Sequence, residues 1–299
     1  MKTVRHTKVI FEEIITGSDV IFQVLDGRNP EGTRNKKLEE FIHKNTPNKE
    51  ILLIINKIDL IPRKVLQDWF NYFRKTTPYK VYGISALYSR GLMELKRKLA
   101  HLFAKRNTKA ILVGYPNCGK SSLIKAFVGD KKNVPISSRA GHTRGIIEIK
   151  ITEKLSLFDT PGIIPISDNS EVDQGIKGVM NPEKIQDKEA VVQALLELYI
   201  TPLKIMEHFG IDNEFVKEKL PDKAESFIAN YMEPDMSSPM TYTDFEILLK
   251  LIGLKRGQLK AGGEINENKV LNTILHAWQK NRIKYYTTPP SIPTREKIQ

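Results

Sequence analysis

The 299-residue chain is 40% hydrophobic, which is ample for a packed core and excludes a wholly disordered protein. Its longest apolar run, residues 51–55, is far shorter than the ~20 residues that a membrane-spanning helix needs, so we expect no membrane contact. The 47 Lys and Arg residues against 35 Asp and Glu give a net charge of +12. This excess favours a polyanionic partner such as RNA over the alternative of a merely solvated, lysine-rich surface.

The cysteine content and the N-terminal segment indicate the compartment. A single cysteine, Cys118, excludes an internal disulfide and a zinc site built from cysteines. Residues 1–13 are partly basic but contain no apolar core and no small-residue cleavage site, so they do not resemble a secretory signal. We therefore expect a cytoplasmic protein, and we expect it to act as a monomer.

From about residue 19, short apolar stretches alternate with amphipathic ones, a pattern typical of a parallel sheet with crossover helices. Strands are predicted at residues 20–25, 51–55, 80–84, 109–113, 146–151 and 155–158. The first four have nearly continuous apolar runs, as expected for strands that are buried on both faces. The last two are close enough in sequence to form an antiparallel pair at one edge of the sheet.

After about Pro165 the periodicity becomes helical. Amphipathic helices are predicted at residues 187–199, 202–209, 242–254 and 268–281. Pro202 suits the first turn of its helix, and Thr241 or Thr243 could cap the next one. We predict an α/β domain over residues 1–168, a mostly α-helical domain that contacts RNA or a ribosomal particle over residues 169–286, and an extended tail over residues 287–299.

A glycine-containing segment, Gly114-Tyr-Pro-Asn-Cys-Gly119-Lys120-Ser121, follows the strand at 109–113 and opens a helical stretch. A phosphate-binding loop requires this context, because its backbone N–H groups and the helix N-terminus together surround the phosphates. We expect Lys120 to reach the β- and γ-phosphates and the Ser121 hydroxyl to bind Mg²⁺. Further contacts are expected from Tyr115, Pro116, Asn117, Cys118, Gly119 and Ser122. Cys118 is predicted to be a small loop residue rather than a nucleophile.

The segment Asn56-Lys57-Ile58-Asp59 follows another strand and distinguishes the base. The Asp59 carboxylate could accept hydrogen bonds from the N1–H and 2-amino groups of guanine, whereas adenine would leave it buried and unpaired. Asn56 and Lys57 would support the base and the phosphate loop. Alone, this tetrapeptide is more often a plain turn, but beside a phosphate loop it predicts GTP or GDP. Ser85-Ala86, also just after a strand, would complete the pocket through the Ala86 N–H.

The segment Asp159-Thr-Pro-Gly162 follows the last predicted strand. Asp159 would hold Mg²⁺ through water, and the Gly162 N–H would meet the γ-phosphate. Thr143 fits a further Mg²⁺ ligand in a switch that becomes ordered with GTP, although an ordinary glycine-containing loop is the alternative. The predicted metal ligands are therefore Ser121, Thr143 and Asp159.

The guanine motif precedes the phosphate loop in this chain, whereas ordinary Ras-like GTPases have the phosphate loop first. In this order the motifs resemble the circularly permuted GTPases of ribosome assembly, the YlqF or ribosome-biogenesis GTPase A family, and most closely the nucleolar GTP-binding protein 2 branch. Asp26-Gly27-Arg28-Asn29-Pro30 resembles the DARxP element of that family, with Gly27 in place of alanine. Further similarity lies at residues 18–26 and 262–282, so the resemblance covers nearly the whole chain.

The resemblance implies a circularly permuted Ras-like P-loop domain with a mostly parallel sheet. It also implies a GTPase that assembles the large ribosomal subunit and binds rRNA or a pre-ribosomal particle. Because the chain lacks the long basic extensions of the nucleolar proteins, it resembles a compact archaeal member.

The position just after Gly162 concerns catalysis. In Ras-like enzymes a glutamine there orients the attacking water, but this chain has Ile163, so free hydrolysis should be slow. Candidates that could compensate are His142, His6, which by position resembles a catalytic histidine proposed in bacterial relatives, and a K⁺ ion bound with Asn117. Each lone histidine is as a rule more often simply solvated.

Three functions are compatible with these motifs. The leading hypothesis is a GTPase that is stimulated by RNA or a ribosomal particle. The second is a GTP-gated RNA-binding module with negligible turnover. The third is a P-loop kinase or ATPase, which the guanine motif disfavours.

Overall fold

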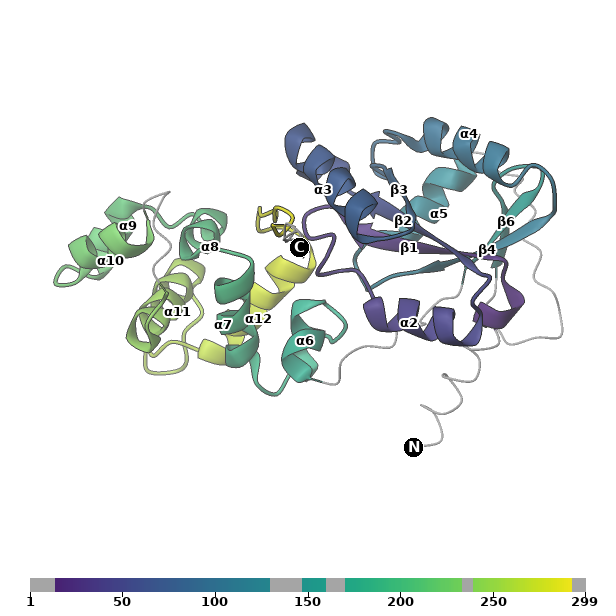
Figure 1. The fold of residues 1–299 in the computed structure, drawn as a ribbon. Helices are drawn as coiled ribbons and strands as arrows, with labels where there is room; N and C mark the ends of the chain where they lie inside the picture. Colours follow the sequence, from purple (N-terminus) through teal and green to yellow (C-terminus); the bar gives the residue numbers. More distant parts are fainter. Residues whose placement is uncertain (1–13, 130–146, 160–169, 233–238, 292–299) are drawn as a thin grey trace, which may run out of the picture. The chain divides into compact units, whose positions relative to one another are not determined.

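In a computed structural model the described residues are 14–129, 147–159, 170–232 and 239–291. The chain forms two compact units (Figure 1). The first comprises Met1–Ser167 together with Tyr286–Gln299, and the second comprises Asp168–Tyr285. Each has a hydrophobic core of its own.

A six-stranded sheet forms the centre of the first unit, as far as the structure describes it. Its strands are β1 (Val20–Asp26), β2 (Glu50–Asn56), β3 (Lys80–Gly83), β4 (Thr108–Val113), β5 (Ile147–Lys150) and β6 (Leu155–Asp159). The order across the sheet is β3-β2-β1-β4-β6-β5, and all neighbours are parallel except β5 and β6. The predicted α/β class, the mostly parallel sheet and the antiparallel edge are confirmed.

Helices cover both faces of this sheet (Figure 1). They are α2 (Lys36–Asn45), α3 (Arg63–Thr76), α4 (Leu92–Leu102) and α5 (Lys120–Val128), and η1 (Ile58–Leu60) is a single 3₁₀ turn. On one face Ile21 and Leu25 of β1 pack with Leu38 of α2 and with Trp69 and Phe73 of α3. Because side chains alternate along a strand, Phe22 and Val24 face the opposite side, and both are fully buried. Burial on both faces explains the continuous apolar runs.

The segment from Tyr286 onward, which includes the predicted extended tail at 287–299, belongs to the first unit. It has no helix or strand up to Ser291, yet Thr287 is held by hydrogen bonds. The backbone N–H and the hydroxyl of Thr287 donate to the Arg28 carbonyl at 2.7 and 3.0 Å. The Trp69 indole N–H donates to the Thr287 carbonyl at 3.0 Å.

The second unit is helical in the part that the structure describes. Its helices are α6 (Glu171–Ile176), η2 (Pro182–Lys184), α7 (Lys188–Leu198), α8 (Pro202–Phe209), α9 (Asn213–Lys219), α10 (Ala224–Tyr231), α11 (Tyr242–Arg256) and α12 (Glu267–Gln279). Pro202 is the first residue of α8, and the Thr241 hydroxyl caps α11 by accepting a hydrogen bond from the Asp244 N–H. The Trp278 indole joins α12 to α6 by donating to the Ile176 carbonyl at 2.8 Å. No helix among the described residues is long and apolar enough to cross a membrane.

Candidate nucleotide site

Three predicted site segments come together at the carboxyl ends of neighbouring strands, where open α/β sheets bind ligands. Asn56 is the last residue of β2, and in the parallel register it lies opposite Asp26, the last residue of β1. Ser85 and Ala86 follow β3, and the loop from Gly114 follows β4. The order of strands therefore places the guanine motif and the phosphate loop side by side, although the first precedes the second in sequence.

The side chain of Asn56 joins three of these segments. Its Nδ2 donates to the Cys118 carbonyl at 2.9 Å, and its Oδ1 accepts from the Ala86 N–H at 3.0 Å. Asn56 is 2% exposed, so both bonds are shielded from water. A single amide thus fixes the phosphate loop against the Ser85-Ala86 turn. The predicted supporting role of Asn56 has a geometric basis here.

Lys57 makes a second connection to the phosphate loop. Its ammonium group donates to the carboxylate of Asp26 at 2.7 Å and also to the Asn117 carbonyl. Both Lys57 and Asn117 have left-handed backbone conformations, with φ of 63° and 61°. Such conformations are uncommon outside glycine and concentrate at ligand sites. The strained backbone of the guanine motif is thereby attached to the strained backbone of the phosphate loop.

Asp26 anchors this corner of the site, although the sequence motifs predicted no separate role for it. Its carboxylate accepts hydrogen bonds from Arg28 Nε and Nη2 at 3.0 and 2.7 Å, in addition to the one from Lys57. Burial would raise the pKa of Asp26, but the hydrogen bonds and positive charges of Arg28 and Lys57 outweigh it and lower the pKa to about 2. Asp26 is therefore a buried anion at neutral pH. The one sequence signal for it was the resemblance of residues 26–30 to the DARxP element.

The carboxylate of Asp59 is suited to a ligand that carries hydrogen-bond donors. Asp59 lies in the η1 turn directly after Lys57, and its Oδ1 is buried without a hydrogen-bond partner among the described residues. A buried acceptor of this kind is costly unless a donor reaches it. The N1–H and 2-amino groups of guanine are such donors. The residues present therefore fit a guanine nucleotide.

The phosphate loop leads directly into helix α5. Gly119 precedes the helix with φ of 94°, and a Cβ there would lie 2.2 Å from Asn56 Nδ2, so the position requires glycine. The Lys120 ammonium donates to the Gly114 and Tyr115 carbonyls at 2.7 and 2.8 Å and so stays close to the loop. Ser121 and Ser122 are exposed in the first turn of α5. The backbone N–H groups of such a turn bind anions.

Cys118 is buried in this loop. Burial, together with the negative charge of Asp26, raises the pKa of its thiol to about 11, even though the charges of Lys57 and Lys120 oppose the shift. The thiol is therefore neutral at physiological pH and lacks the thiolate character of a nucleophile.

Several of the remaining predicted residues lie in or next to segments that the structure leaves undescribed. His6, His142, Thr143 and Gly162 fall outside the described residues. Asp159 is the last residue of β6, next to β4 in the sheet, and only its backbone is described. Pro116 is part of the phosphate loop. Ser85 is fully buried, and its hydroxyl accepts a long hydrogen bond from the Tyr88 N–H at 3.4 Å.

Comparison with known proteins agrees with this geometry. A family model described as RsgA GTPase matches residues 5–167, and one described as 50S ribosome-binding GTPase matches residues 109–228. An uncharacterised GTP-binding protein of Methanocaldococcus jannaschii is 34% identical over 292 residues, which cover 96% of this chain and 69% of that protein. Nucleolar GTP-binding protein 2 of Saccharomyces cerevisiae is 30% identical over 290 residues, covering 95% of this chain and 54% of that protein.

A solved structure shares the fold. The crystal structure of GNP-bound YlqF from T. maritima aligns with a TM-score of 0.57 at 18% identity, covering 93% of this chain and 96% of that one. The rotated order of the guanine motif and the phosphate loop, their meeting at one edge of the sheet, and these matches lead to one conclusion. The chain belongs to the YlqF-like circularly permuted GTPases.

Proposed function

We propose that this GTPase is an assembly factor of the large ribosomal subunit, which binds rRNA or a subunit precursor when loaded with Mg²⁺ and GTP and is released when the particle-stimulated hydrolysis of GTP takes place. The main support for this proposal is the site in which the guanine motif and the phosphate loop meet. There the Asn56 side chain is hydrogen-bonded both to the Cys118 carbonyl and to the Ala86 N–H. The descriptions of one matching family model and of the nucleolar relative supply the ribosomal context. The chain spans about half the length of that nucleolar relative.

Binding of GTP would use the groups described above. Asp59 would accept hydrogen bonds from the base, and the N–H groups of the first turn of α5 would bind the phosphates. Lys120 would exchange its loop carbonyls for phosphate oxygens, which are stronger acceptors because they are charged. We propose Ser121, Thr143 and Asp159 as the protein groups that hold Mg²⁺ directly or through water. Mg²⁺ supplies positive charge to the β- and γ-phosphate oxygens when it is bound.

The water-activating group is proposed from sequence position. Ile163 cannot orient water, so His142, His6 or a K⁺ ion near Asn117 would have to compensate. Asn117 is exposed in the loop, and its own carbonyl accepts a hydrogen bond from Lys57. A K⁺ ion at this point would add positive charge where an arginine finger acts in other GTPases.

The charge distribution supports a contact with RNA through one part of the chain. Residues 168–285 carry 19 Asp and Glu against 15 Lys and Arg, whereas the rest of the chain carries 16 against 32. The first unit is thus the source of the net positive charge. We propose that it supplies most of the phosphate contacts, and that binding weakens as salt rises because counterions are released. The helical unit would contact other components of the particle.

A cytoplasmic location fits a chain with a single reduced cysteine.

The connection between the site and the helical unit suggests how GTP would control binding. Residues 160–170 are all that separates β6 from α6, and they include Gly162 of the γ-phosphate motif. In a Ras-like chain this motif leads onward within the same domain. The permuted order would transmit the γ-phosphate contact directly to the helical unit.

Co-sedimentation tests this proposal. The full chain is centrifuged with purified large subunits and their precursors in the presence of GDP or a non-hydrolysable GTP analogue. We expect enrichment with the particles that is several-fold higher with the analogue. Equal sedimentation with both nucleotides would refute GTP gating, and no sedimentation with either would refute the ribosomal partner.

A second function is the GTP-gated binding module with negligible turnover. Ile163 favours it, because the usual water-orienting glutamine is missing. It predicts the same co-sedimentation, but no hydrolysis above background even when particles are present.

A further inference from the structure

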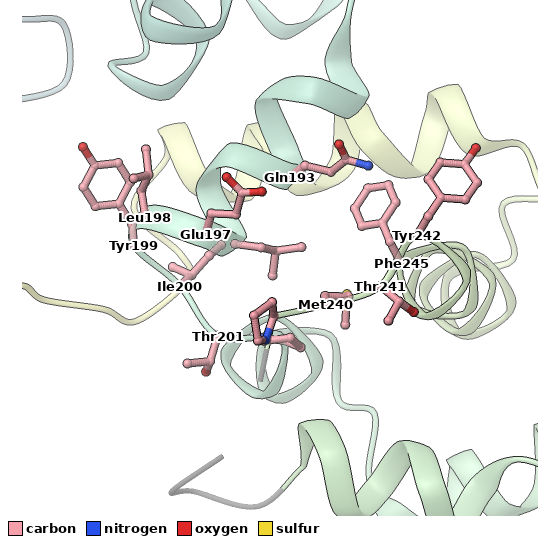
Figure 2. A pocket seen from close by; sticks show the side chains of 13 residues that line it. Gln193, Glu197, Leu198, Tyr199, Ile200, Thr201, Met240, Thr241, Tyr242 and Phe245 are labelled. Carbon is pink, nitrogen blue, oxygen red and sulfur yellow. The ribbon is translucent and has the colours of Figure 1, made fainter. Parts of the chain in front are cut away.

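The helical unit contains a pocket that is separate from the nucleotide site. Its volume is about 630 Å³, within the range of sites that hold a ligand or an anchoring side chain. Gln193 and Glu197 of α7, Met240, and Tyr242 and Phe245 of α11 surround it (Figure 2). All these residues belong to the second unit, so the pocket is formed within one compact body.

Some of the apolar side chains that line the pocket are buried, and others are exposed to solvent. Phe245 and Ile200 are almost completely buried, at 2% and 3% exposed, and they contribute apolar surface to the pocket wall. In contrast, Leu198 and Tyr242 are 59% and 62% exposed. Large apolar side chains that remain this exposed beside a cavity are typical of a surface that binds a partner.

The charge around this pocket is negative, although the chain as a whole carries a net charge of +12. Glu197 is the charged residue among those that line it, and no Lys or Arg lines it in the described part of the helical unit. Next to it, the negative charges of Glu189 and Glu246, together with that of Glu267, raise the pKa of Tyr242. Such a rim repels nucleic acid phosphates and attracts cationic groups.

We propose that this pocket binds a basic peptide segment of a protein partner, with an apolar side chain inserted between Ile200, Met240 and Phe245. Lys or Arg residues on either side of that side chain would reach Glu197, and their stems or guanidinium groups would lie on the Tyr242 ring. This contact goes beyond the proposed nucleotide-gated function and does not depend on it. It assigns protein recognition to the helical unit and leaves phosphate binding to the basic first unit.

The test uses the full chain and a defined probe. The probe is a fluorescent 12-residue peptide that alternates Lys with Leu and Gly. A peptide with Glu in place of Lys and a 12-nucleotide RNA serve as comparisons. Affinity is measured by fluorescence anisotropy, and the bound position is mapped with a benzophenone amino acid at position 242. We expect cross-linking of the Lys peptide and none of the Glu peptide.

Charge-reversal variants locate the contact. Glu197→Lys should weaken binding of the Lys peptide by about tenfold, because it places a like charge at the rim. Glu218→Lys makes the same change on α9, where Glu218 is exposed and paired with Lys219, and should change the affinity less than about twofold. Binding of GDP should be the same in both variants, so a failure here is distinguishable from a failure of the nucleotide site.

Several outcomes would overturn the proposal. Equal loss in both variants would mean that the peptide responds only to overall charge. Cross-linking of the RNA, of the Glu peptide or of a second copy of the chain at position 242, in preference to the Lys peptide, would assign the pocket to a different occupant.

Discussion

The ammonium of Lys57 lies 2.7 Å from the carboxylate of Asp26, and this ion pair joins the ends of two neighbouring parallel strands. Lys57 also donates to the Asn117 carbonyl. The pair therefore connects the residue that follows β2 with the end of β1 and with the phosphate loop after β4. Because Arg28 also binds this carboxylate, two cationic side chains of the first unit share one buried negative charge.

The buried charge of Asp26 predicts a specific acid sensitivity. Folding lowers the pKa of Asp26 from 3.8 to about 2, so its stabilisation is complete above pH 3.8 and is lost as the pH falls toward 2. A shift of this size corresponds to about 2 kcal/mol. Between pH 5 and pH 2 the free energy of unfolding of the first unit should therefore fall in both proteins. The fall should be larger in the wild type than in Asp26→Asn, by about 2 kcal/mol.

The measurement can follow the first unit alone. The chain has two tryptophans, Trp69 in the first unit and Trp278 in the second, so urea unfolding in a Trp278→Phe background reports on Trp69. Asp26→Asn should also be less stable at neutral pH, because Arg28 and Lys57 lose a buried partner. Parallel pH profiles for the two proteins would contradict the assignment of a low pKa to Asp26.

The bridging amide of Asn56 predicts a large loss of stability on truncation. Asn56→Ala leaves the Cys118 carbonyl and the Ala86 N–H without their partner in a buried setting. We expect a loss of about 2–4 kcal/mol in the stability of the first unit. Asn45→Ala is the matched control, because Asn45 is exposed at the end of α2 and donates only to the Phe41 carbonyl. The control should change stability by less than about 0.5 kcal/mol; similar losses in both variants would rule out a special role for the bridge.

The environment of Cys118 predicts an inert thiol. With its pKa raised to about 11 and no access to solvent, Cys118 should react with a thiol reagent at pH 8 on the order of 100-fold more slowly in the native protein than in the unfolded one. Absorbance of the released thiolate follows the reaction, and one thiol per chain should appear on unfolding in guanidinium. Rapid stoichiometric modification of the native protein would show that the loop opens readily.

The buried Oδ1 of Asp59, which has no hydrogen-bond partner among the described residues, predicts a change in nucleotide preference on substitution. Asp59→Asn replaces one acceptor with a donor and should weaken the binding of GTP by about ten- to a hundredfold. Xanthosine triphosphate carries an acceptor in place of the 2-amino group, so it should bind the variant more tightly than it binds the wild type. Fluorescent nucleotide titrations measure both. Asp68→Asn, a partly exposed position on α3 paired with Lys64, should leave the preference unchanged. An unaltered preference in Asp59→Asn would remove the guanine assignment.

The sheet could be predicted because its strands are buried on both faces. Every residue of β1 is buried, and so is every residue of β2 after Glu50, so the apolar runs stand out in the sequence. The short helices α6, α9 and α10 were missed. Ser170 and Asp212 cap the first two through their side chains, but a cap before six or seven residues is a weak signal. These helices exist because side chains such as Val216 and Phe227 are buried in the helical core.

The residues of the site could be predicted where a sequence motif identifies them. Contacts that depend on how neighbouring strands are aligned could not be predicted. Asn56, Lys57 and Lys120 follow from local patterns. The contact from Lys57 to Asp26 depends on the parallel register of β1 and β2, which aligns Asn56 with Asp26. The fixation of Thr287 uses mainly backbone atoms, including the Arg28 carbonyl, and these leave no mark in the sequence. The pocket in the helical unit likewise arises from packing between helices.

We propose that this site hydrolyses GTP slowly on its own and rapidly on a ribosomal particle. The most direct measurement is phosphate release from GTP by the full chain, with and without large ribosomal subunits, in K⁺ and in Na⁺. We predict slow release by the free protein, at least about tenfold stimulation by the subunits, and a higher rate in K⁺ than in Na⁺. A rate of phosphate release that changes neither with particles nor with the choice of cation would contradict particle-stimulated hydrolysis at this site.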